Sequence, residues 1–209
     1  MNKLYKKIKE DIKRDQSIYY GLIITIVISI VFGALFITIL KESDKELVLG
    51  HLTDFLNSIS SNGIDHTKIF KNSVFSNNIY LIIMWLLGIS AIGMPIIILM
   101  LFFKGFVLGF SVTSIIYQYK LSGLLGSLVY IFPHLIINII VYFVVSYYAL
   151  KLSLTIIQCI FKRKPIDIKI FINKYLVILG MSIILLLISS LIEAYITPFF
   201  VRMFLILVQ

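Results

Sequence analysis

Charged side chains inside long apolar runs are the residues of this chain with the greatest capacity for chemistry. Lys151 and Glu193 are two of them, and a charge held near the middle of a bilayer is a candidate for a proton relay or an ion-coupling site. At about 1.5 Å of rise per residue, Lys151 lies about 25 Å beyond the start of its run at His134, and Glu193 about 27 Å beyond Tyr175. We therefore expect both near a membrane boundary, where neither would act as a relay.

A set of polar residues is predicted to gather at one of these boundaries. His134 opens an apolar run, Asn138 follows one turn later, and Glu193 closes the last long run on the same side. Asn77 and Asn78 enter another run there. Such a rim could dock a partner, or its members could be interfacial side chains hydrated among lipid headgroups. Both interpretations stay open from the residues alone.

Catalytic and metal-binding signatures are missing from the sequence. It contains no H-E-x-x-H, G-x-S-x-G or P-loop motif. Glu193 has no second carboxylate in an apolar run to pair with, and Cys159 is the only cysteine, which excludes an intrachain disulfide and a cysteine-based metal site. The sequence therefore predicts a protein that is not an enzyme and that carries no cofactor or metal.

Composition places the chain in a membrane. Of its 209 residues, 60% are hydrophobic and 14% charged, against about 45–50% and 25% in a soluble domain. The net charge of +9 lies mainly in short segments between apolar runs rather than in one patch. That distribution is typical of loops that meet anionic lipid, so we expect membrane lipid, and no nucleic acid, as a partner.

The apolar runs predict an all-α, polytopic integral membrane protein with about five transmembrane helices. The predicted segments are a cytoplasmic basic N-terminus (1–17), transmembrane helix 1 (18–40), an external loop with an amphipathic helix (41–78), transmembrane helices 2 to 4 (79–103, 105–119 and 134–161, within 79–161), a cytoplasmic basic loop (162–174), and transmembrane helix 5 with an external C-terminal segment (175–209). Residues 121–132 are either a bent continuation of helix 3 or an interfacial stretch.

Orientation follows from the bias of Lys and Arg toward the cytoplasm. Six bases lie between Lys3 and Arg14, and five lie in the 162–174 loop. Lys104, predicted to lie between helices 2 and 3, agrees with this arrangement. We therefore expect the N-terminus inside the cell, and the 41–78 loop and the C-terminus outside.

The external loop has a helical pattern of its own. Leu49, Leu52, Leu56 and Ile59 recur at helical spacing and give one apolar face. This face could lie on the membrane surface or against a partner, and packing onto the protein's own helices is an equal alternative.

Small residues predict close helix contacts. Gly105 and Gly109 form a G-x-x-x-G pattern, which serves either packing within one chain or contact between copies in a homo-oligomer. Gly88, Gly93 and Pro95 are predicted to allow close approach and a kink inside helix 2.

Several of these residues also carry a family resemblance. Between Asn78 and Phe110 and near the end of the chain, the sequence contains Met84-Trp85, Gly88, Ser90, Gly93, Pro95, Lys104-Gly105, Glu193-Ala194-Tyr195 and Thr197-Pro198. With this pattern the chain resembles the stage II sporulation protein M family over essentially its whole length. Pro133-His134 also resembles a P-H-x-x-x-E pattern of wider relatives, but Asn138 replaces the carboxylate, so no carboxylate role is expected there.

The resemblance implies a membrane scaffold in engulfment of the forespore during sporulation. It would recruit and position peptidoglycan hydrolases, the stage II sporulation proteins D and P, at the septal or engulfing cell membrane. The alternative function is a permease-like membrane subunit of a transporter. That alternative requires a polar path at mid-bilayer, and the predicted spans offer almost none.

Overall fold

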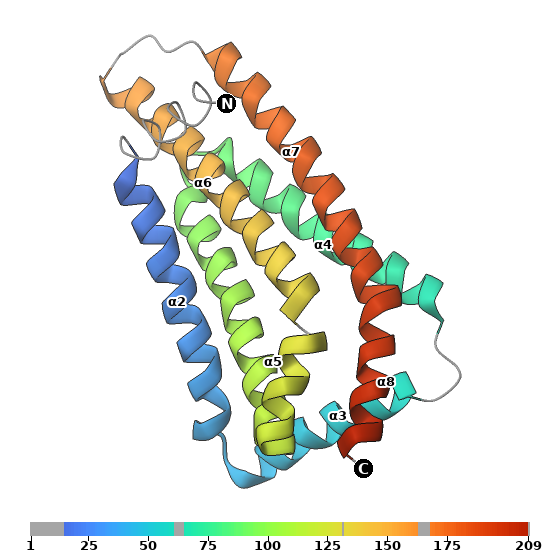
Figure 1. The fold of residues 1–209 in the computed structure, drawn as a ribbon. Helices are drawn as coiled ribbons and strands as arrows, with labels where there is room; N and C mark the ends of the chain where they lie inside the picture. Colours follow the sequence, from blue (N-terminus) through green and yellow to red (C-terminus); the bar gives the residue numbers. More distant parts are fainter. Residues whose placement is uncertain (1–14, 61–64, 131, 163–167, 209) are drawn as a thin grey trace, which may run out of the picture.

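The computed structural model of the chain describes residues 15–60, 65–130, 132–162 and 168–208, and these residues are almost entirely helical. The elements are α2 (Gln16–Ile39), α3 (Glu42–Ser60), α4 (His66–Gly88), α5 (Gly93–Tyr130), α6 (Phe132–Lys162), α7 (Ile168–Leu191), the π-helical turn η1 (Ile192–Ile196) and α8 (Thr197–Val208). The long helices form a bundle, and α3 and α8 lie together at one end of it, called the α3 end below (Figure 1). The basic residues of segment 1–14 and of 163–167 lie outside the described ranges.

Four helical segments among the described residues are long and apolar enough to cross a membrane. They are Gln16–Ile39, Gly93–Leu124, Pro133–Cys159 and Ile172–Ile206. The chain is thus an all-α membrane protein. Helix α4 also runs obliquely from near the α3 end toward the opposite end (Figure 1), but its first half is polar. A fifth span therefore stays a prediction.

The structure divides the predicted helices 2 and 3 at a different place. Helix α4 ends at Gly88 and α5 begins at Gly93, so the predicted helix 79–103 is wrong. A Cβ atom at Gly93 would lie 1.9 Å from the carbonyl oxygen of Leu87, so only glycine permits this tight turn. Pro95 sits in the first turn of α5, where its missing N–H costs no hydrogen bond, and it does not kink a helix. Lys104 lies inside α5 rather than in a loop.

Helix α5 packs in parallel against α2 through glycines. A Cβ atom at Gly105 would lie 1.9 Å from Ser29 Oγ, and one at Gly109 would lie 2.0 Å from the carbonyl oxygen of Ile30. Gly33 of α2 lies as closely against Phe106. The G-x-x-x-G pattern therefore brings two helices of the same chain together. Because Ser29 lies near the middle of α2, Lys104 beside Gly105 lies near mid-depth of the bundle.

Residues 121–132 were predicted to be either a bent continuation of helix 3 or an interfacial stretch. Residues 121–130 instead form a helical segment that reverses the direction of α5. Lys120 interrupts α5 with φ 53° and ψ −129°. After it the chain runs back along α5, so that a Cβ atom at Gly123 would lie 2.3 Å from the carbonyl oxygen of Ile115. Helix α6 then continues in the same direction (Figure 1).

Replacing Lys120 with glycine should stabilise this reversal. A non-glycine residue with positive φ costs about 1–3 kcal/mol, and the flexibility of glycine in the unfolded state offsets part of the gain. We expect a net increase of about 1 kcal/mol in the free energy of unfolding, measured by thermal unfolding in detergent micelles. The control Lys120→Ala keeps the strain and should show no gain. A glycine variant less stable than the alanine variant would contradict the assigned backbone.

Helix α3 packs onto the protein's own helices. Leu56 is buried against Val201, Phe204 and Leu205 of α8. Nζ of Lys45 lies 3.0 Å from the carboxylate of Glu42 and donates to the hydroxyl of Tyr117 in α5 at 3.3 Å. These contacts fasten α3 to both α5 and α8.

The last helices begin earlier and continue further than predicted. Helix α7 starts at Ile168, inside the predicted basic loop 162–174 and before the predicted start at Tyr175. Pro198 does not end the helix, because the π-helical turn η1 bends it just before that residue and α8 follows directly (Figure 1). At the end opposite α3, Lys151 pairs with Asp15, as expected for a boundary residue.

Candidate functional site

Four elements bring polar side chains together inside the bundle. We call this set the central polar cluster: Ser73 and Asn77 of α4, Lys104 of α5, His134, Asn138 and Tyr142 of α6, and Glu193 of η1. They line a cavity of about 150 Å³. A cavity of this size has room for about five water molecules at about 30 Å³ each.

Helical spacing places the members of the cluster. His134, Asn138 and Tyr142 are four residues apart and therefore share one face of α6, and Ser73 and Asn77 share a face of α4 in the same way. The sequence predicted His134 and Asn138 as neighbours but not Tyr142. Its spacing of four residues from Asn138 indicates that it shares their helix face. The prediction also missed Lys104, because a charged residue beside glycine was interpreted as a loop.

Glu193 enters the cluster from an irregular turn of helix. In η1 the backbone N–H of Thr197 bonds the carbonyl oxygen of Ile192, five residues earlier. The carbonyl oxygen of Ala194 accepts a hydrogen bond of 2.7 Å from Nδ1 of His66, which lies outside η1. The ring of His66 stacks on that of Tyr195. The first residue of α4 thus supports the π-helical turn, an irregularity that is frequent at functional sites.

A chain of hydrogen bonds ends at the Glu193 carboxylate. The hydroxyl of Tyr142 donates to Asn77 Oδ1 at 3.1 Å, and Asn77 Nδ2 donates to Ser73 Oγ at 3.2 Å. Ser73 Oγ then donates to Glu193 Oε2 at 2.6 Å. A length of 2.5–2.7 Å is typical of a hydroxyl bonded to an ionised acceptor. These three donors can all point toward Glu193, as a carboxylate requires, and Ser73 Oγ also lies 2.9 Å from Ser190 Oγ.

Lys104 lies between two tyrosine rings. Its Nζ is 4.3 Å from the centroid of Tyr80 and 4.7 Å from that of Tyr142. Ring faces attract a cation by about 0.5–2 kcal/mol each, which partly offsets its removal from water. Among the described residues no direct ion pair joins Lys104 to Glu193. The two opposite charges therefore face the same cavity without touching.

Asn138 leaves an unsatisfied acceptor at this cavity. Its side chain is 5% exposed, and its Oδ1 has no hydrogen-bond partner in the described part of the protein. Its neighbour His134 is 8% exposed, with its carbonyl oxygen accepting from Ser189 Oγ at 3.0 Å and its Nδ1 at 3.4 Å from Thr197 Oγ1. A buried acceptor without a donor costs about 1–3 kcal/mol.

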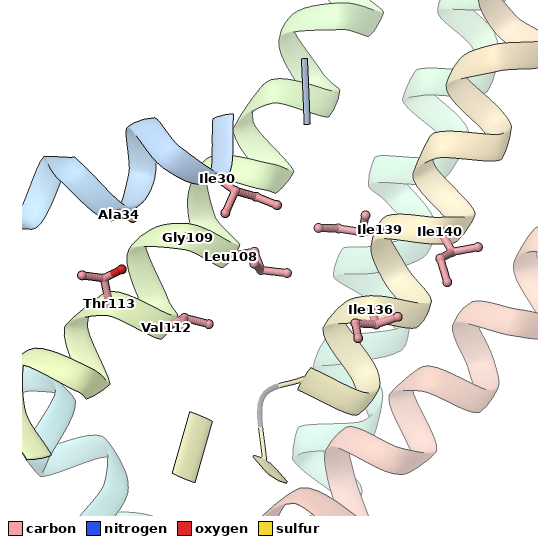
Figure 2. A pocket seen from close by; sticks show the side chains of 9 residues that line it. All are labelled: Ile30, Ala34, Leu108, Gly109, Val112, Thr113, Ile136, Ile139 and Ile140. Atoms are coloured by element: carbon pink, nitrogen blue, oxygen red, sulfur yellow. The ribbon is translucent and has the colours of Figure 1, made fainter. Parts of the chain in front are cut away.

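Two larger cavities adjoin the central one. One, of about 610 Å³, lies beneath α3 with largely apolar walls and shares Val107, His134, Leu135 and Glu193 with it. The other is a groove of about 460 Å³ between α5 and α6, in which Leu108 and Val112 face Ile136 and Ile139 (Figure 2). The central cavity therefore shares wall residues with two larger apolar spaces, and those shared with the groove are Leu108 and Ile139.

The residues proposed for partner docking have mostly inward positions. His134 and Asn138 are buried, and Glu193 faces the cavity, so the predicted rim turns into the bundle. Leu52 and Leu56 contact the cluster formed with α8, and Leu49 is half-buried. Asn78 Nδ2 donates to the carbonyl oxygen of Val74 at 2.8 Å, and the side chain of Ile59 lies outside the described part of the chain.

Gly88, predicted to pack, lies where α4, α6 and α7 meet. A Cβ atom there would lie 2.3 Å from the Tyr175 hydroxyl and 2.7 Å from Ala149 Cβ. The helices hold more polar side chains near mid-depth of the bundle than the sequence predicts, because Lys104 lies inside α5 and faces the central polar cluster.

Comparison with known proteins gives one family. The model of the family described as stage II sporulation protein M matches residues 22–198, a range that includes every member of the central polar cluster. No curated protein and no solved structure matches the chain.

Proposed function

The chain belongs to the stage II sporulation protein M family, and from this membership, together with the layer formed by α3 and α8, we propose that it is a membrane scaffold for peptidoglycan hydrolases during engulfment of the forespore. Its partners would be the stage II sporulation proteins D and P, which the family resemblance implies. In this proposal the partners perform the hydrolysis, and the chain only holds them at the membrane.

The proposal needs the α3 end to face the cell wall. The start of α2, the end of α6 and the start of α7 lie together at the opposite end (Figure 1). The basic segment 1–14 adjoins the first of these, and the bases of 162–169 lie between or beside the other two. Lys and Arg favour the cytoplasmic side, so this arrangement supports an external α3 end.

The observation that carries the proposal is the fastened position of α3. Lys45 and Leu56 hold this helix to α5 and α8, while Leu47 and Phe55 on it are each 61% exposed. A helix that is fixed in place and presents large apolar side chains loses little conformational entropy when a partner binds. It therefore suits a docking platform better than a free loop would.

Substituting both exposed residues should weaken the complex. We expect Leu47→Ser with Phe55→Ser to reduce co-purification of proteins D and P from sporulating membranes by about tenfold, because central apolar residues of interfaces contribute about 2 kcal/mol or more. Replacing all of residues 41–78 would not test the docking surface alone, because this range includes Ser73 and Asn77 of the central polar cluster.

A matched control is available at the opposite end. Ile92 is 78% exposed in the turn between α4 and α5, and Ile92→Ser should leave co-purification unchanged. Equal recovery of both hydrolases with the α3 variant and with the control would reject α3 as the docking platform.

A further inference from the structure

We propose that the central polar cluster binds a small zwitterion with an apolar side chain, in chemical class an apolar amino acid. Its ammonium would face Glu193 and Asn138, its carboxylate would face Lys104, and its side chain would extend into the cavity beneath α3. This binding does not depend on the scaffold function, and it concerns occupancy rather than transport.

Charge balance selects a ligand without net charge. Lys104 and Glu193 line the cavity with opposite charges, and His134 and Tyr142 are the other titratable groups that line it. An ion with net charge would leave one uncompensated charge near mid-depth of the bundle, which is costly in a membrane protein. A zwitterion satisfies both charges at once and adds none.

The free hydrogen-bonding groups select the same chemistry. Asn138 is a wall residue of the cavity and has a buried Oδ1 with no hydrogen-bond partner among the described residues, and an ammonium brings up to three donors. Lys104 contacts ring faces and offers N–H donors for which a carboxylate is the natural acceptor. Lys104 and Glu193 line the same cavity with no direct ion pair between them, so each charge is available to a ligand that carries both partners.

The adjoining cavity indicates an apolar side chain. The cavity of about 610 Å³ beneath α3 has mostly apolar walls and so favours an apolar group, whereas the cavity of about 150 Å³ beside the charges can hold water. A mostly apolar cavity with a few convergent polar groups is the usual form of a small-molecule site. His134 and Glu193 lie on the boundary between the two spaces.

Ligand analogues test the proposal on the unaltered protein. Radiolabelled leucine should bind saturably to the full-length chain in lipid nanodiscs. 3-Methylbutylamine, which lacks the carboxylate, and 4-methylpentanoate, which lacks the ammonium, should each compete about tenfold or more weakly than leucine, because each leaves a buried polar group unpaired. Glycine should compete weakly as well, since it cannot fill the apolar cavity.

Variants test the assigned residues. Lys104→Met and Glu193→Gln should each weaken leucine binding about tenfold or more. Thr25→Val, whose hydroxyl bonds only within α2, should bind leucine normally. Absence of saturable leucine binding at millimolar concentration would overturn the proposal, and so would competition by either analogue as strong as that by leucine. Both results concern the wild-type chain, so misfolding of a variant cannot obscure them.

Discussion

Replacing Gly109 with alanine should separate α2 from α5 and destabilise the protein by about 2–3 kcal/mol, because an added methyl group has no room there. Its Cβ atom would lie 2.0 Å from the carbonyl oxygen of Ile30 and 2.8 Å from the carbonyl carbon. These are backbone atoms, so no side-chain rotation relieves the clash, and the two helices must move apart. The loss is measurable as a lower free energy of unfolding in detergent micelles.

Gly21 provides the matched control for this prediction. It lies on the same helix pair, in α2, and a Cβ atom there meets no atom within 4 Å. Gly21→Ala should therefore leave stability unchanged or raise it slightly, since alanine favours helix more than glycine does. If Gly109→Ala were as stable as Gly21→Ala, the close contact between α2 and α5 would be refuted, and the G-x-x-x-G pattern would have to act between copies of the chain.

The apolar runs predict most of the helices, because lipid contact leaves a long signal in the sequence. Helix 18–40 corresponds to α2, and 134–161 lies within α6. The predicted boundary between helices 2 and 3 at residue 104 is wrong for a physical reason. The real turn at 89–92 contains no charged residue, so hydropathy continues through it, whereas Lys104 is the charge that hydropathy treats as a boundary.

The candidate site was only partly predictable for a related reason. Spacing along one run gives the depth of a residue and the helix face that it shares, which placed His134, Asn138 and Glu193 at a similar level. It does not give the direction of that face, because direction depends on which helices pack beside it. The inward rotation of these residues, and their meeting with Lys104, follow from the packing of α4, α5 and α6.

The turn that positions Glu193 had no usable sequence signal. A π-helical turn has no characteristic residue pattern. The supporting contact joins His66 to Ala194, residues that are far apart in sequence. Such a contact can be identified only once the fold is known.

Removing either of the two charges that line the central cavity should produce the second large loss of stability. Lys104→Met leaves the Glu193 carboxylate without a cation across the cavity, and Glu193→Leu leaves the ammonium without an anion. Both side chains are half-buried and no direct ion pair joins them, so removing one costs less than the loss of about 3–5 kcal/mol typical of a buried salt bridge. We expect each single variant to lose about 2 kcal/mol of unfolding free energy in detergent micelles.

The double variant distinguishes this explanation from general damage to the core. If the remaining charge causes the loss, Lys104→Met combined with Glu193→Leu should be more stable than either single variant, with a coupling energy of about 1–3 kcal/mol. The pair Lys45 and Glu42 gives the control, since the Glu42 side chain is 81% exposed and Glu42→Gln should cost at most about 0.5 kcal/mol. Additive losses in the double variant would show that the two charges do not act on each other. The cavity would then join two independent polar groups, and its net neutrality would carry no argument for a zwitterionic ligand.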